Sequence, residues 1–229
     1  MSSTTHHAQP QAVTLTDGQA RRSRRKGARP GELLAAALDL FVEKGFAATR
    51  VEEVAARAGV SKGTLFLYFP SKEELFKAVV RENISGRFAE WNEAFDRFDG
   101  STQDMLRYCL FNWWERLGSS KASGIPKLMM SEAQNFPELA SFYQHEVMQP
   151  ANTLIQRILQ RGVVRGEFRA MDLRYGAYLV MAPMLFLALW KHSLGTCCDA
   201  PAQLDPQSYL TAQLDMLLHG FCAQTPSNH

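Results

Sequence analysis

A short outward-facing segment carries the residue types best suited to chemistry. Its hydrogen-bonding side chains are Lys62, Thr64 and Tyr68, and Gly63 between them would let a partner come close to the backbone. Leu67 lies at another outward position, where an apolar side chain could touch a thymine methyl group. An amine, hydroxyls and accessible backbone at this spacing suit contact with DNA.

The helix that positions these side chains is short and must be held by its neighbours. Ser61 is a suitable N-cap and Pro70 cannot continue a helix, so the sequence predicts a helix over Lys62–Tyr68. A helix of about seven residues is not stable alone in water. Leu65 and Phe69 are the expected inward anchors.

A second short helix is predicted immediately before it. Thr49 and Glu52 fit a capping box, and apolar residues then recur at the helical period until Gly59 ends the helix. A small helix, a Gly-containing turn and a clamped second helix are typical of a helix-turn-helix, whose second helix enters the major groove. An ordinary helical hairpin within a bundle is the alternative interpretation.

The stretch GFAATRVEEVAARAGVSKGTLFLYFPSKEELFKAVV resembles the DNA-binding domain of the TetR/AcrR family of transcriptional regulators. The matching residues are Gly45, Phe46, Thr49, Val54, Ala55, Ala58, Gly59, Val60, Ser61, Lys62, Gly63, Leu65, Phe69, Lys72 and Leu75, within about residues 30–80. Phe66 stands where the family usually has a Tyr that contacts a phosphate. The resemblance implies DNA contacts from Thr49, Ser61, Lys62, Gly63, Thr64, Leu67, Tyr68 and Lys72.

A strongly basic run precedes this domain, with six Lys or Arg among residues 21–29. Residues 1–72 carry eleven Lys or Arg against six Asp or Glu, a net charge of +5, whereas the whole chain carries only +2. We expect residues 1–29 to form a disordered basic arm, and we expect it to lie along phosphates or in the minor groove. The expected contacts come from Arg21, Arg22, Arg24 and Arg25; a purely solvated arm is the alternative.

Composition limits the remaining function classes. The chain has 229 residues and 46% hydrophobic content, enough for a sizeable core, and its four cysteines fit no metal-ligand spacing. Residues 1–30 hold no apolar core of a secretory signal, so we expect a cytoplasmic protein with reduced thiols. The absence of a Gly-rich phosphate loop, nucleophile elbow or paired-carboxylate site predicts that the chain is not an enzyme and has no metal site or cofactor.

The whole chain predicts an all-α fold, in which a three-helix N-terminal domain is joined by a long helix to a helical C-terminal domain. Residues 30–78 form the helix-turn-helix domain, residues 79–224 form the ligand-binding and dimerisation domain, and residues 225–229 form a tail. The joining helix is expected to run from Ser71 to about Phe98. Further helices are expected near 102–118, 125–134, 137–165, 172–194 and 206–223.

The resemblance implies that the last two helices form a four-helix dimer interface. Ala177–Trp190 is uncharged but shorter than the roughly 20 apolar residues that span a bilayer, so it is expected to be buried in protein and not in a membrane. A homodimer would read a palindromic operator with two recognition helices. The expected interface residues are Leu185, Leu189, Leu214, Leu217, Leu218 and Phe221, unless they close a monomeric core.

Aromatic and methionine residues are frequent in the C-terminal domain, and together they favour a pocket for a small apolar or aromatic effector. The candidate lining residues are Tyr108, Phe111, Trp114, Met129, Phe142, His145, Tyr178 and Met181. Each of them could instead be a core residue. The resemblance implies a repressor that its effector releases from DNA; a DNA-binding regulator without an effector and an activator are the alternatives.

Overall fold

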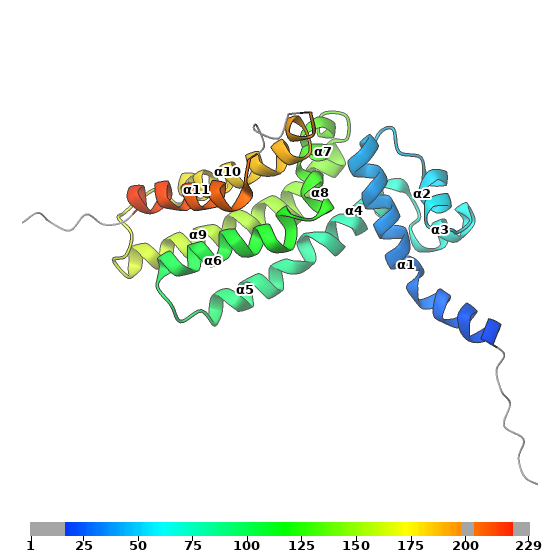
Figure 1. Cartoon of the computed structure of the whole chain (residues 1–229), viewed down its shortest axis with the longest axis horizontal. Coiled ribbons are helices and arrows are strands. Elements are labelled where there is room, and N and C mark those ends of the chain that lie inside the picture. Colours follow the sequence, from blue (N-terminus) through cyan, green and yellow to red (C-terminus); the bar gives the residue numbers. More distant parts are fainter. Residues whose placement is uncertain (1–16, 198–203, 222–229) are drawn as a thin grey trace, which may run out of the picture.

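The computed structural model describes residues 17–197 and 204–221, with the backbone alone for residues 17–29 and Phe221. It confirms the all-α fold. An N-terminal domain of helices α1 to α3 occupies one end of an elongated molecule, and α4 leads from it into a helical bundle (Figure 1). The expected tail at residues 225–229 lies outside the described residues.

The N-terminal domain contains α1 (Asp17–Lys44), α2 (Val51–Arg57) and α3 (Lys62–Tyr68), followed by α4 (Lys72–Asn83). Ser61 caps α3 as expected, because its hydroxyl accepts a hydrogen bond from the Thr64 amide at 3.0 Å. Leu65 is fully buried and holds α3 against α1 and α2. The sequence therefore predicted the helix-turn-helix and the boundaries of α3 correctly.

Helix α1 begins earlier than the sequence suggested. Residues 17–29, expected to be disordered, continue the helix, and Pro30 lies in its interior. Arg, Ala and Gln are strong helix formers, which explains the extension. A proline inside a helix removes one hydrogen bond and produces a bend, and α1 changes direction along its length (Figure 1).

Two residues expected on phosphates have structural roles instead, and the first is Thr49. Its side chain is 2% exposed and its hydroxyl lies 2.7 Å from the Gly45 carbonyl oxygen and 3.1 Å from that of Leu40. The predicted phosphate contact is therefore wrong for this side chain. The capping box at α2 is also shifted by one residue, to Arg50 and Glu53.

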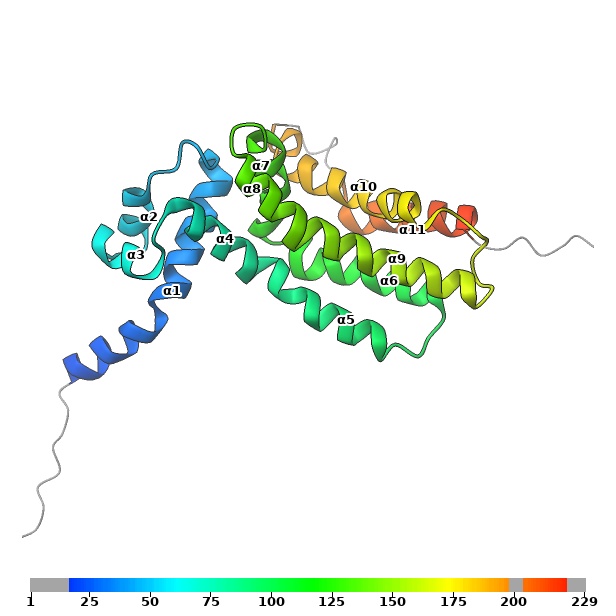
Figure 2. The ribbon, with the colours of Figure 1, turned by 180° about the vertical axis from the view of Figure 1, so that it is seen from behind.

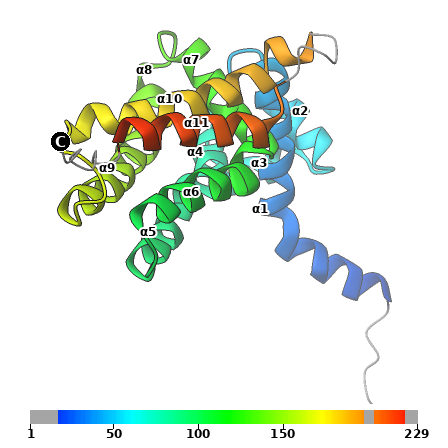
Figure 3. The ribbon, with the colours of Figure 1, turned by 60° about the vertical axis from the view of Figure 1, so that its left-hand side comes forward.

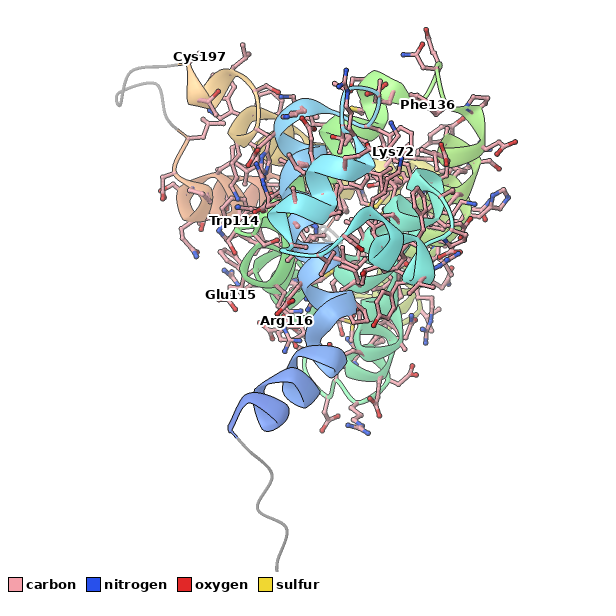
Figure 4. The ribbon with its side chains drawn as sticks, turned by 90° about the vertical axis from the view of Figure 1, so that its right-hand side faces the viewer. Lys72, Trp114, Glu115, Arg116, Phe136 and Cys197 are labelled. Carbon is pink, nitrogen blue, oxygen red and sulfur yellow. The ribbon has the colours of Figure 1, made fainter. Side chains whose placement is uncertain are left out.

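Lys72 is the second residue that was expected on a phosphate and has a structural role instead. Its ammonium donates to the carbonyl oxygens of Phe46, Ala47 and Thr49 at 2.8, 3.3 and 3.2 Å and lies 4.4 Å from the centre of the Phe46 ring. The side chain lies among the helices of the N-terminal domain (Figure 4). Since all three protons are directed at the α1–α2 connection, the predicted phosphate contact is wrong in this conformation.

The joining helix is interrupted. Helix α4 ends at Asn83, a 3₁₀ turn η1 covers Ser85–Arg87, and α5 covers Phe88–Asp96. Ile84 leaves helical geometry with φ −127° and ψ −70°, and a Cβ on Gly86 would lie 2.7 Å from the Arg81 carbonyl oxygen. The Ser-Gly pair thus permits a close turn that the predicted continuous helix from Ser71 to Phe98 did not include.

The bundle consists of α6 (Thr102–Trp113), α7 (Ile125–Glu132), α8 (Pro137–Tyr143), α9 (Gln149–Val164), α10 (Leu173–Lys191) and α11 (Pro206–Phe221). π-helical turns η2 (Trp114–Gly118) and η4 (Gln144–Met148) extend α6 and join α8 to α9, and 3₁₀ turns η3 (Lys121–Gly124) and η5 (Leu194–Thr196) precede α7 and follow α10. Pro150 lies two residues after η4, and the wider turn accommodates its missing N–H. Helices α10 and α11 lie together on one side of the bundle, opposite α5 (Figures 1 and 2).

One apolar cluster extends across the junction between the N-terminal domain and the bundle. It includes Phe46, which follows α1, Phe76 on α4, and Leu117, Ile125 and Leu139 from the bundle. A second cluster fills the bundle between α6, α9, α10 and α11. The N-terminal domain therefore shares its core with the elements that follow α6.

Polar contacts reinforce this junction. Arg81 on α4 donates from Nε and a terminal nitrogen to the two carboxylate oxygens of Glu146 at 2.9 and 2.6 Å. Buried Glu132 accepts a hydrogen bond from the Ala47 amide at 3.0 Å, and Lys121 pairs with Asp39 at 2.6 Å. These contacts link η4, α7 and η3 to three different parts of the N-terminal domain.

Lys72→Met should lower the free energy of unfolding by about 2 kcal/mol, because it removes charged hydrogen bonds to three carbonyl groups while keeping the apolar stem. Urea denaturation at neutral pH measures the effect. Lys77→Met is the control, since Lys77 pairs with half-exposed Glu74, and its loss should cost less than about 1 kcal/mol. A Lys72→Met protein with unchanged stability would show that the ammonium does not hold the α1–α2 connection.

Candidate DNA-binding surface and internal cavity

The outer face of α3 is unusually apolar for an exposed surface. Leu67 is 84% exposed, and Phe66 and Tyr68 are exposed as well. A Cβ on Gly63 would meet only the Ser61 hydroxyl, at 3.8 Å, so the backbone at the start of α3 is open. This face can approach a flat or grooved partner closely and offers an apolar side chain, a phenol and free backbone.

The polar side chains on this face are engaged with one another in the free protein. The hydroxyls of Ser61 and Thr64 lie 2.9 Å apart, and Lys62 pairs with Glu52 at 2.6 Å. The hydrogen bond from Lys62 lowers the pKa of the Glu52 carboxyl. Both partners are more than half exposed, and such a pair is weak enough to exchange for a phosphate.

The folded N-terminal domain has little free positive charge. Residues 30–78 contain six Lys or Arg and seven Asp or Glu, a net of −1. Lys44 pairs with Glu53, Arg57 with Glu43, and Lys77 with Glu74. The net positive charge of the first third of the chain therefore lies in residues 21–29, which include the candidate contacts Arg21, Arg22, Arg24 and Arg25 on α1; their side chains lie outside the described part.

A cavity of about 170 Å³, partly open to solvent, lies in the bundle and is lined mainly by α5, α6, α9 and α10. Its wall is formed by Ile84, Phe88, Trp91, Ala94, Phe95, Phe98, Met105, Tyr108, Cys109, Asn112, Trp113, Leu117, Ser123, Pro126, Tyr143, Val147, Met148, Ala151, Leu154, Ile155, Ile158, Met181, Met184, Leu185 and Ala188. None of these side chains carries a formal charge at neutral pH. Such a wall suits an apolar molecule.

The few polar groups in the wall are neutral. Burial raises the pKa of the Cys109 thiol to about 12 and also raises the pKa of the Tyr143 hydroxyl, so both stay protonated. The Ser123 hydroxyl donates to the Ser120 carbonyl oxygen and lies 2.8 Å from Nε2 of His192. Burial, with nearby lysines adding repulsion, lowers the pKa of His192 to about 4, which keeps the imidazole neutral.

The structure places two of the eight predicted ligand residues, Tyr108 and Met181, in the cavity wall. The predicted positions of the other six are wrong for this cavity. Met129 is buried in the first apolar cluster and Phe142 packs against it, while Phe111 and Trp114 pack against the second cluster. His145 and Tyr178 are exposed. Figure 4 shows Trp114 with Glu115 and Arg116 on the flank of the bundle.

Helical periodicity does carry a signal for part of the cavity wall. Met105, Tyr108, Cys109 and Asn112 follow the i, i+3, i+4, i+7 spacing on α6, and all four line the cavity. Helix α5 carries aromatic residues at comparable spacing, including Phe88, Trp91 and Phe95 in the wall. A polar Asn within an apolar helical stripe marks a face that meets a cavity and not a dry core.

The predicted dimer residues are only partly available to a second subunit. Leu214 is 1% exposed and belongs to the core of its own chain, and Leu185 lines the cavity, so both assignments are wrong. Leu189, Leu217 and Leu218 are half-buried, and the side chain of Phe221 lies outside the described residues. All these leucines have helical spacing, but the side chains of Leu185 and Leu214 face the interior of their own chain.

A different set of apolar residues forms the exposed face of α10 and α11. The most exposed members are Tyr175, Leu179 and Met216, with Tyr178 and Phe186 beside them. Figure 3 shows α11 alongside α10 at this face. We refer to these five residues as the α10–α11 face. Contiguous exposed apolar residues of this kind mark interaction surfaces.

Within the described residues, no group of three or more His, Cys, Asp or Glu side chains is arranged to hold a metal ion. The described free thiols are Cys109 and exposed Cys197, which lies at the far end of α10 (Figure 4). One described segment, Leu173–Thr196, is long and apolar enough by composition to cross a membrane, but α10 within it packs six residues into the core of the bundle.

Comparison with known proteins places both parts of the chain in one family. Residues 33–79 match the model of bacterial regulatory proteins of the tetR family, and residues 99–196 match that of the tetracyclin repressor-like C-terminal domain. The structure is similar to that of the fatty acid degradation regulator FadR from Bacillus halodurans, with a TM-score of 0.68 and 21% identity over 83% of this chain and 94% of FadR.

Similar sequences include the regulator RutR of Escherichia coli, 52% identical over 72 residues, which is 31% of this chain. The match spans only 33% of RutR. The uncharacterized HTH-type transcriptional regulator Mb1581 of Mycobacterium bovis is 36% identical over 139 residues, or 61% of this chain and 65% of that protein. With both domain models matched in order along an all-α structure of this kind, the chain belongs to the TetR family of bacterial regulatory proteins.

Proposed function

We propose that the protein is a homodimeric, cytoplasmic repressor that binds a palindromic DNA operator and is released by a small, largely apolar effector. The observation that carries this proposal is the uncharged cavity beside the turn between α4 and α5, where Ile84 and Phe88 line its wall. A molecule in the cavity would press on the element that leads directly to the DNA-binding helices. Family membership agrees with the expectation that the chain is not an enzyme.

The outer face of α3 would read the operator. Leu67 and Phe66 suit contact with thymine methyl groups, while Tyr68, Thr64 and Lys62 can hydrogen-bond to base edges or phosphates. Lys62 would exchange Glu52 for a phosphate oxygen on binding. Ser61 supports these contacts by capping the helix that presents them, and Gly63 allows the close approach of the backbone.

The basic extension of α1 would supply the electrostatic part of the affinity. The folded domain from residue 30 to residue 78 has a net charge of −1, so it cannot by itself attract a polyanion strongly. The six basic residues at positions 21–29 continue α1 as a helix that projects from the N-terminal end of the molecule (Figure 3). A helix in this position can follow the phosphate backbone beside the recognition helix.

Deleting residues 1–28 should weaken binding to specific and random DNA to a similar extent. It should also flatten the dependence of log K on log salt concentration by about 0.9 for each phosphate that the shortened protein no longer neutralises. Fluorescence anisotropy across a salt series measures both effects. A full-length variant with Gln at the five basic positions that the deletion removes should behave like the deletion. A salt slope unchanged in both variants would show that this extension does not bind DNA.

The α10–α11 face would form the dimer interface and so place two copies of α3 on one side of the assembly. Two recognition helices related by a two-fold axis read half-sites about 34 Å apart, one turn of the DNA helix. The five exposed apolar residues of this face replace Leu185 and Leu214 of the sequence-based expectation.

Leu179→Asp should convert the dimer to a monomer at micromolar concentration, because a carboxylate at this 61% exposed position would be buried without a partner at the interface. Sedimentation equilibrium measures the change. Val164→Asp is the matched control, since Val164 is 74% exposed at the end of α9 and is not part of the α10–α11 face, and the variant should remain dimeric. A dimeric Leu179→Asp protein would place the interface elsewhere.

Release by an effector would be a population shift between two spacings of the recognition helices. A ligand that weakens operator binding a hundredfold must bind the DNA-incompetent state about a hundredfold more tightly than the competent one. The contacts that differ between the states would be those that cross the junction, such as Arg81 with Glu146 and Glu132 with the Ala47 amide. They tie α4 and the α1–α2 connection to the bundle.

The test is binding of the full-length protein to the intergenic region upstream of its own gene, with nonspecific competitor DNA and a panel of apolar and aromatic compounds. Specific binding that one compound releases is the expected result. Tyr68→Ala should weaken specific binding by about 1–3 kcal/mol and leave nonspecific binding nearly unchanged. Specific binding that no compound alters would contradict the effector part of the proposal, and purely nonspecific binding would contradict the choice of operator.

A further inference from the structure

Several polar side chains of the cavity wall make no hydrogen bond to another described residue. Asn112 on α6 and Tyr143 on α8 both line the cavity, and neither side chain makes a hydrogen bond to another described residue. The buried Trp91 Nε1 in the same wall also lacks a partner, whereas the Ser123 hydroxyl is engaged with Ser120 and His192. An Asn side chain offers two donors and one carbonyl acceptor, and a tyrosine hydroxyl offers one donor.

The residues of the same wall carry no formal charge. Arg157 lies over the ring of Phe95, and Arg161 lies 3.7 Å from Met105 Sδ, but Arg157 is engaged with Asn92 and Asp96, and Arg161 with the carbonyl oxygens of Phe98 and Gly100. The third cation beside the wall is Lys191, whose ammonium lies 3.4 Å from the Ser123 hydroxyl. Its protons are directed to the carbonyl oxygens of Gly118, Ser119 and Ser120 at 2.9, 2.6 and 3.0 Å, so it faces away from the cavity. A carboxylate or phosphate in the cavity would lose its hydration without gaining a partner, and burial of an unpaired ion is strongly unfavourable.

We propose that the effector is an uncharged, largely apolar molecule carrying a neutral hydrogen-bonding group, such as a ketone or ester carbonyl, and that Asn112 and Tyr143 bind this group. The inference rests on the proposed function, which it makes specific by excluding anionic effectors such as free carboxylic acids. It separates shape recognition by the aromatic and aliphatic wall from polar recognition by two side chains on different helices. The Asn112 amide and the Tyr143 hydroxyl both donate to a carbonyl oxygen.

Two matched sets of probes test the proposal by isothermal titration with the full-length protein at pH 7.5. The linear set is 2-decanone, decane and decanoate, and the fused-ring set is 2-acetonaphthone, 2-ethylnaphthalene and 2-naphthoate. In at least one set, the ketone should bind about fivefold or more tightly than the hydrocarbon, which corresponds to one net hydrogen bond. The carboxylate should bind at least about tenfold more weakly than the ketone.

Variants assign the polar contact to its residues. Asn112→Leu and Tyr143→Phe should each weaken ketone binding about two- to fivefold and leave hydrocarbon binding unchanged or stronger. Asn135→Leu is the control, since Asn135 is exposed and lies outside the wall, and this substitution should not alter ketone binding. Thermal unfolding of each variant confirms that it is folded, and neither substitution in the wall removes a hydrogen bond to another described residue.

The outcomes separate this inference from the function on which it rests. A carboxylate that binds as tightly as its ketone, or a ketone whose affinity neither variant changes, would overturn the inference while leaving an apolar effector in place. Failure of every probe to bind would overturn both the inference and the effector part of the proposed function. Operator binding, measured separately, is independent of all these results.

Discussion

The arrangement of this protein depends on an apolar cluster that crosses the boundary between the N-terminal domain and the bundle. Phe46, which follows α1, meets Phe76 of α4 at a ring separation of 5.5 Å and Phe136 of the bundle at 4.7 Å, in both cases edge to face. Protein cores are close-packed and resist continuous deformation. The N-terminal domain therefore cannot turn freely on a hinge at α4, and any change in its orientation must repack this cluster.

The same cluster forms part of the cavity wall. Ile84, Leu117 and Val147 belong to the cluster and also line the cavity, and they come from the α4–α5 break and the π turns η2 and η4. Segments with irregular helical geometry are where a helix can shift without losing its whole hydrogen-bond ladder. A molecule bound in the cavity would therefore act on the junction through Ile84, Leu117 and Val147, which lie in the least regular elements of the junction. This gives a physical reason for two discrete arrangements, since packed interfaces switch between states and do not bend gradually.

Local patterns predicted much of the fold, because the determinants of α2, α3 and the bundle helices lie within a few residues of each helix. The Ser61 cap and the Gly59 turn are examples, and Gly59 has the expected positive φ of 68°. Thr49 and Lys72 were misassigned because their partners are backbone carbonyls 4 to 26 residues away, which no local pattern reveals. The cavity wall was only partly predicted for the same reason. Helical spacing gives a stripe on α6, but only the packing of α5, α9 and α10 around it decides whether the stripe meets a space or a core.

The DNA-binding end of the chain and the cavity differ in charge, so electrostatics contributes differently to binding at each. The basic residues at positions 21–29 precede a folded domain of net charge −1, whereas the described residues that line the cavity include no charged side chain. In the proposed function, operator affinity would contain a large counterion term that depends on salt, and binding in the cavity would contain almost none. An effector held without charge cannot neutralise the basic extension or repel the DNA. Under the proposed function, its influence on DNA would come from geometry, through the close-packed junction, so that the uncharged wall and the shared apolar cluster would belong to a single mechanism.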